Sequence, residues 1–135
     1  MATIVLTDPY VSLGGNVVSD HVTQVTINYS AEMLDETAMG DTTRINKGGL
    51  KQWSINVDMH QDFAAAQIDS IFFPLVGTAI AFEIRPTSAV VGTSNPKYTG
   101  TGILENFPPL GNGVGELGTA SITIQSASTL ARATA

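Results

Sequence analysis

Two segments with the alternation of β-strands stand on either side of a long insertion. Residues 22–29 place Val25, Ile27 and Tyr29 on one face and polar side chains on the other, which is the pattern of a strand with one buried face. Residues 50–59 repeat it, with Trp53, Ile55, Val57 and Met59 as the apolar positions. Adjacent antiparallel strands are usually joined by about 2–5 residues, whereas residues 30–49 intervene here. The rest of the fold has to accommodate this insertion.

The inserted segment carries apolar side chains that a fully solvated loop does not need. A connection of this length in a compact domain is usually functional or disordered. We therefore predict that residues 30–49 form an assembly loop, which packs on a partner outside its own domain. Its acidic residues lack the spacing and the terminal glutamate of a calcium-binding loop, which favours a surface facing solvent or a partner. The residues predicted at the subunit interface are Met33, Leu34, Asp35, Glu36, Met39, Asp41 and Arg44.

The composition indicates one domain whose surface carries few charges. Of the 135 residues, 43% are hydrophobic and 13% charged, against about 25% charged in typical globular proteins. Charged residues are depleted where partners cover a surface, so this composition favours an assembling protein. A secreted or merely Thr- and Ser-rich β-protein is the alternative. We predict a single domain over residues 1–135.

The charge balance argues against a protein that binds nucleic acid tightly. Twelve acidic and six basic residues give a net charge of −6, and the basic residues are scattered along the chain. Tight phosphate binding needs clustered Lys and Arg. An acidic wall, in contrast, would repel DNA and let it pass without adhesion.

Other protein classes are excluded by what the sequence lacks. The absence of cysteine excludes a disulfide scaffold, thiol catalysis and cysteine metal sites. The first residues lack the basic and apolar regions of a signal peptide, and no apolar run reaches the roughly 18 residues that span a membrane. The sequence therefore predicts a protein that is made and kept soluble in the cytoplasm, with no membrane contact.

The remaining patterns predict a mainly β protein. Further strands are predicted at residues 2–6, 78–86, 99–107 and 119–125, and a flexible tail at residues 126–135. The one predicted helix spans about residues 62–73, with Asp62 as its N-cap. Antiparallel strands with one flanking helix fit a β-sandwich or a partly closed barrel. The edges of such a sheet favour strand addition from other copies.

No group of residues meets the requirements of a catalytic or cofactor site. His21 and His60 have no serine or aspartate at a recognised catalytic spacing, and no two carboxylates are placed for acid–base work. The glycine-rich residues 111–118 precede a predicted strand and lack the lysine of a phosphate-binding loop. We therefore predict no enzyme, no cofactor and no metal site, and we assign Trp53 to the core.

Several segments of the chain are informative when they are taken together and in order. YSAEMLDETAMGDTTR is followed by GGLKQWSINVDMHQDFAA, FFPLVG, IRPTSA and NPKYTGTG. In this order they resemble the major tail tube proteins of long-tailed bacteriophages with non-contractile tails. The resemblance runs from about residue 14 to residue 132, and DETAMGDTTR followed by GGLK and Trp53 is its most specific part.

The resemblance implies a structural subunit of a virion tail. Members of that family are β-sandwich or barrel subunits that form hexameric rings, and the rings stack into a hollow tube. Sheets joined across subunits line an acidic channel through which DNA passes without specific binding. The implied partners are further copies of the chain and the tape-measure, terminator and distal tail proteins. By strand alternation, the candidate channel-facing acidic residues are Asp58, Glu83 and Glu105.

Two other functions stay open at this point. Another phage morphogenesis protein, such as a tail terminator or a capsid-decorating subunit, would form one ring or trimer and no filament. A small β-sandwich module that binds carbohydrate or protein ligands would need an exposed aromatic platform. The aromatic residues here fall mostly on inward strand positions, which disfavours that module.

Overall fold

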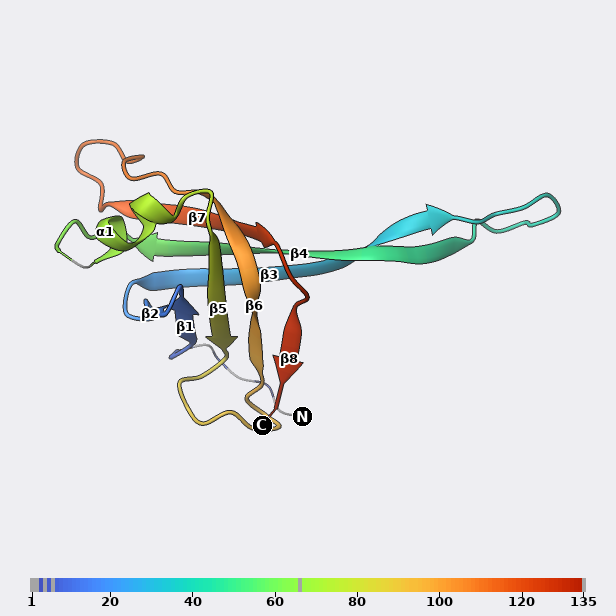
Figure 1. Ribbon diagram of the computed structural model, residues 1–135, viewed down its shortest axis with the longest axis horizontal. Coiled ribbons are helices and arrows are strands. Elements are labelled where there is room, and N and C mark those ends of the chain that lie inside the picture. The colour runs from blue at the N-terminus through green and yellow to red at the C-terminus, as the bar shows by residue number, and fades with distance from the viewer. Residues whose placement is uncertain (1–2, 4, 6, 66, 135) are drawn as a thin grey trace.

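The computed structural model describes residues 3, 5, 7–65 and 67–134, and about half of these residues form strands (Figure 1). The elements are β1 (Tyr10–Leu13), β2 (Asn16–Val17), β3 (Val22–Asp35), β4 (Asn46–His60), α1 (Ile68–Phe72), the 3₁₀ turn η1 (Phe73–Leu75), β5 (Ala79–Arg85), β6 (Lys97–Asn106), β7 (Thr119–Ser126) and β8 (Ala131–Ala133). The predicted mainly β, antiparallel fold with one helix is confirmed.

All eight strands belong to one antiparallel sheet that does not close on itself. The strand order is β2-β1-β5-β6-β7-β4-β3, and β8 pairs with β6 beside this path. β3 and β4 run along the longest axis of the molecule, and β5 and β6 cross them (Figure 1). The sheet is therefore bent over its own core rather than closed as a barrel, and β3 forms a free edge.

The core lies inside the bend, because successive residues of each strand face opposite sides of the sheet. Ile55 and Val57 of β4, like Ile122 and Ile124 of β7, are fully or almost fully buried, whereas their neighbours face outward. Trp53 lies in this core, as predicted, and its ring meets that of Phe82 edge to face at 5.1 Å.

The insertion is a β-hairpin with a short tip rather than a loop. β3 continues to Asp35 and β4 begins at Asn46, so residues 30–35 and 46–49 lie in strands. The alternation of apolar and polar residues ends near residue 30. Beyond it only the pairing of the two strands extends the hairpin, with Ala31 opposite Lys51 and Asp35 opposite Asn46. An extension that buries no apolar face leaves no period-two signal in the sequence.

The helix is shorter than predicted. α1 begins at Ile68, and Asp62 does not cap it. The carboxylate of Asp62 instead accepts the backbone N–H of Ala64 at 2.9 Å, which closes a local turn. The backbone N–H of Gln61 donates to Gly118 O at 3.0 Å. These bonds hold residues 61–65 in a loop.

Both ends of the chain differ from the expected strands. A strand predicted at residues 2–6 lies partly outside the described residues, and Thr3 and Val5 are not in a strand. Among the described residues the first strand is β1, which Asp8-Pro9 precedes rather than follows. The tail expected to be flexible contains β8, which pairs with β6. Trp53 Nε1 donates to Ser128 O at 2.8 Å and so ties this segment to the core.

Candidate functional site

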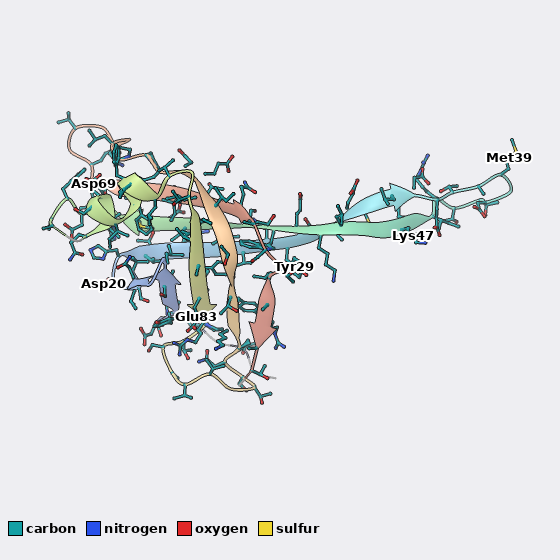
Figure 2. All side chains as sticks on the ribbon, in the orientation of Figure 1. Asp20, Tyr29, Met39, Lys47, Asp69 and Glu83 are labelled. Atoms are coloured by element: carbon teal, nitrogen blue, oxygen red, sulfur yellow. The ribbon has the colours of Figure 1, made fainter. Side chains whose placement is uncertain are left out.

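The hairpin extends beyond the body of the molecule. We call residues 30–50 the arm; it lies at one end of the longest axis, with Met39 at its tip (Figure 2). Met33 is 61% exposed and Leu50 81% exposed, and Met39 is fully exposed. No residue of the arm belongs to the buried core. The other exposed apolar residues of the arm are Leu34 and Ile45.

The tip of the arm has a defined turn. The backbone N–H of Ala38 donates to Asp41 Oδ2 at 2.8 Å, and that of Ile45 donates to Thr37 Oγ1 at 2.7 Å. The hydroxyl and backbone N–H of Thr37, together with Arg44, lower the pKa of Asp35. Arg44 Nη1 lies 2.5 Å from Asp35 Oδ2. These bonds shape the tip and leave its apolar side chains uncovered.

The structure brings the predicted interface residues together on the arm. Met33, Leu34 and Asp35 end β3, whereas the others belong to the tip that follows. Gly49 leaves room for the side chain of Leu34, because a Cβ at position 49 would lie only 3.3 Å from Leu34 Cδ1. Their contact with another subunit stays a prediction. The tip residues are Glu36, Met39, Asp41 and Arg44.

A groove runs beside the free edge of β3. Its volume is about 350 Å³, and β3 faces β5 and β6 across it. The walls are mainly apolar, although Arg85 also lines it. Because β3 pairs only with β4 among the described strands, both the groove and the backbone of this edge are open to a partner. The apolar and aromatic lining residues are Val25, Ile27, Tyr29, Ile84, Tyr98 and Leu130.

The outward face of β4, β6 and β7 is polar and internally hydrogen-bonded. Ser121 Oγ donates to Asp58 Oδ1 at 2.6 Å, and Gln125 Nε2 donates to Glu105 Oε2 at 2.8 Å. Thr123, between these two, donates to Asn56 Oδ1 at 3.1 Å. We call this surface the polar face. Amide and hydroxyl groups dominate it, and its two carboxylates are hydrogen-bonded.

Glu83 does not join the other two candidate acidic residues. It lies in β5, away from the polar face, near the lower end of the molecule in Figure 2. Its carboxylate is 2.9 Å from Arg85 Nε, and the guanidinium of Arg85 lies 4.0 Å from the ring centre of Tyr10. Alternation places all three carboxylates outward but cannot show that the sheet bends between them.

The end opposite the arm carries exposed apolar side chains that the sequence analysis did not single out. They come from the segment around α1 and from residues 108–118, which lie at the same end in Figure 1. Gln61 joins the two segments, because its Nε2 donates to Pro109 O at 2.9 Å. A signal was present in the sequence, since Phe73 and Val76 are apolar residues at and beyond the end of the predicted helix. This helix-end patch consists of Phe63, Phe73, Val76, Leu110, Val114 and Leu117.

A histidine links two acidic residues beside this patch. His21 Nδ1 lies 2.9 Å from Asp20 Oδ1, and Nε2 lies 3.1 Å from Asp62 Oδ2. Burial of the imidazole opposes its protonation, but the two carboxylates outweigh burial and raise the pKa of His21. The Ala64 N–H, and then His21, lower the pKa of Asp62. The cluster thus ties the start of β3 to the loop before α1.

We expect this cluster to make stability depend on pH. Because the pKa of His21 is raised from its ordinary value of 6.5, the stability that His21 contributes is complete below pH 6.5. This stability is lost as the pH rises through the pKa of the folded state. The contribution of Asp62 is complete above 3.8 and is lost as the pH falls. The decrease in Tm caused by His21→Gln should therefore be largest between pH 3.8 and pH 6.5 and smaller at pH 8. An equal loss at pH 6 and pH 8 would contradict this reading.

The described residues show no further chemical site. They contain no cluster of three or more potential metal ligands, and none of their helices is long and apolar enough to cross a membrane. The side chain of His60 makes no hydrogen bond to the Asp20–His21–Asp62 cluster. Only its backbone N–H bonds to the cluster, by donating to His21 O at 2.8 Å. What the molecule presents is a set of surfaces: the arm, the β3 edge, the polar face and the helix-end patch.

The fold is similar to that of chains in two solved structures of a gene transfer agent (GTA) particle. One structure is described as the virion of the native GTA particle; its chain matches with a TM-score of 0.70 and 17% identity, over 93% of this chain and 95% of that chain. The other is described as the tail of an empty GTA particle with C6 symmetry; the TM-score is 0.67 and the identity 17%, over 91% and 92%. No family model and no curated protein match the sequence. The chain thus has, over nearly its whole length, the fold of a chain from a C6-symmetric tail.

Proposed function

We propose that this protein is the tail tube subunit of a phage-like particle. It assembles into hexameric rings, and the rings stack into a hollow tube that delivers DNA. The observation that carries this proposal is the match, over 91% of the chain, to a chain of a C6-symmetric tail. The exposed arm, the open β3 edge and the polar face supply the surfaces that such an assembly requires.

The β3 edge fits a role in closing each ring. Its outward backbone groups are free to pair with a strand of a neighbouring copy, and the adjoining groove offers apolar surface to the same neighbour. The edge runs for 14 residues, which is long for an edge left exposed to solvent. Pairing around the ring would convert six open sheets into one continuous wall.

The polar face suits a channel surface that does not hold DNA. Its uncharged amide and hydroxyl groups bring no positive charge to the phosphates, and Asp58 and Glu105 repel them. Six copies at −6 each give 6 × −6 = −36 for a ring, which further disfavours adhesion. Glu83, which pairs with Arg85, contributes less to such a field.

The remaining assignments follow from this role. The protein would be made in the host cytoplasm and then reside in the tail of the virion, without catalytic activity. Besides further copies of itself, its partners would be tape-measure, terminator and distal tail proteins. DNA would be in contact with it only in transit.

Electron microscopy of purified protein tests the proposal. Concentrated protein should form hollow filaments of stacked rings with six-fold symmetry in negative stain. A single closed ring or trimer without filaments would instead indicate a terminator or a decoration protein. A protein that remains monomeric in sedimentation at millimolar concentration would overturn the proposal, and binding of the monomer to a glycan array would favour a ligand-binding module.

A further inference from the structure

The glycine-rich loop before β7 contains the one asparagine of the chain that precedes a glycine. The chain has seven asparagines, and the other six precede larger residues. Asn112 and Gly113 are both exposed, and neither lies in a helix or strand. Leu110 and Val114 of the helix-end patch are close to them in the same loop. The assembly surfaces described above give this Asn-Gly pair no role.

An Asn-Gly pair is chemically labile in water. Asparagine is among the thermolabile residues, and glycine, which has no Cβ, leaves its backbone nitrogen open to the preceding side chain. The Gly113 nitrogen bonds to Asn112 Cγ, the Cγ–Nδ2 bond breaks, and ammonia leaves with the proton that the Gly113 nitrogen gave up. Water then opens the five-membered imide at either carbonyl, which yields aspartate or isoaspartate. Water is the only co-reactant, and no group is oxidised or reduced.

In the folded subunit the first residue of β7 holds the side chain of Asn112. Asn112 Oδ1 accepts the backbone N–H of Thr119 at 2.9 Å, and Asn112 Nδ2 donates to Thr119 Oγ1 at 3.2 Å. Both polar atoms of the amide are thus engaged, and Thr119 is itself fixed because it pairs with His60. Rotation of the amide out of this arrangement breaks both bonds.

Two other asparagines provide internal references. Asn95 is buried, and its Nδ2 donates to Ala89 O at 2.9 Å. The next residue is Pro96, whose nitrogen carries no hydrogen and cannot form the imide. Asn46 is exposed like Asn112 but precedes a lysine, whose side chain crowds the attacking nitrogen. The same reaction should therefore be absent at Asn95 and slow at Asn46.

From these observations we propose that Asn112–Gly113 is a site of spontaneous deamidation, which the bonds to Thr119 slow in the folded subunit. The product carries a carboxylate in place of the amide, so the net charge of the chain changes from −6 to −7. This charge arises beside the exposed side chains of Leu110 and Val114 and makes the helix-end patch less apolar. The modification needs no enzyme and is independent of the proposed tail tube function.

Peptide mass spectrometry after prolonged incubation at mildly alkaline pH tests the site. Aspartate and isoaspartate should accumulate at position 112, while Asn95 and Asn46 stay intact over the same time. Gly113→Ala should suppress the reaction, because its methyl group shields the nitrogen. The new Cβ would lie 3.1 Å from Glu116 Oε1, which is the movable end of an exposed side chain. An intact Asn112, or equal conversion of Asn46, overturns the proposal.

Variants of Thr119, which is exposed, test the restraint on the reaction. Thr119→Val removes the hydroxyl that accepts the Asn112 amide and should speed deamidation about two- to tenfold, as expected for the loss of one hydrogen bond. Thr119→Ser keeps the hydroxyl and is the matched control. In urea that unfolds both variants and the unaltered protein, all three should react equally fast and faster than the folded protein. Equal rates of the two folded variants, or no acceleration in urea, would refute the restraint.

Discussion

Replacement of residues 32–50 by Asn-Gly should abolish filaments and leave a folded subunit. Ala31 pairs with Lys51, so a two-residue Asn-Gly turn can join them in the same register. No arm residue lies in the core, so the circular dichroism spectrum and the cooperative thermal transition should be retained. Negative-stain microscopy and sedimentation then measure assembly alone.

Milder changes separate the side chains of the arm from its length. A variant in which Met33, Leu34 and Met39 become serine keeps the hairpin but loses apolar area, since burial of each such side chain contributes about 1.5–3 kcal/mol. It should polymerise only at much higher concentration. Thr42→Ser with Thr43→Ser is the control and should polymerise normally. Filaments of ordinary length from the Asn-Gly variant would refute the role given to the arm.

Substitution of Gly102 by valine should cause the largest loss of stability. A Cβ at this position would lie 2.3 Å from Ile124 Cγ2 and 2.7 Å from Gln125 O. The backbone oxygen cannot move aside without breaking the β6–β7 pairing, in which Gly102 faces Ser126. Overpacking of this kind costs about 3 kcal/mol or more and should lower the Tm by roughly 10 °C.

Gly48 provides the matched control for this substitution. It also lies in a strand, yet a Cβ there meets nothing within 4 Å. Gly48→Val should therefore leave the Tm of the subunit within a few degrees, as for most surface substitutions. Equal Tm values for the Gly102 and Gly48 variants would show that β6 can relax away from Ile124.

Alternation in the sequence identified the strands that have one buried and one exposed face. The strand predicted at residues 119–125 corresponds to β7, and that at 78–86 to β5. The same rule missed the outer half of the hairpin, because both of its faces are exposed and no burial pattern marks it. It also missed β8, a three-residue strand. Pairing with β6 holds this strand in place, and a hydrogen bond from Trp53 to Ser128 holds the segment that precedes it.

The candidate site was predictable where it depended on local sequence. The length and apolar content of residues 30–49 indicated a segment that reaches outward, and the structure places it there as the arm. The separation of Glu83 from Asp58 and Glu105 was not predictable, because it depends on the bend of the sheet. The Asp20–His21–Asp62 cluster joins residues 41 positions apart, which no local spacing rule can detect.

The open edge of β3 has a further consequence for how assembly can be followed. In an antiparallel pair, every second backbone N–H of an edge strand points away from its partner, toward solvent in an isolated subunit. These amides should exchange their hydrogens for deuterium rapidly before a neighbour arrives and slowly afterwards, whereas the amides shared with β4 are protected throughout. The outward amides of β3 thus report assembly, and the amides that bond to β4 serve as an internal reference. Deuterium uptake along β3 would therefore show the order in which contacts within a ring and between rings form.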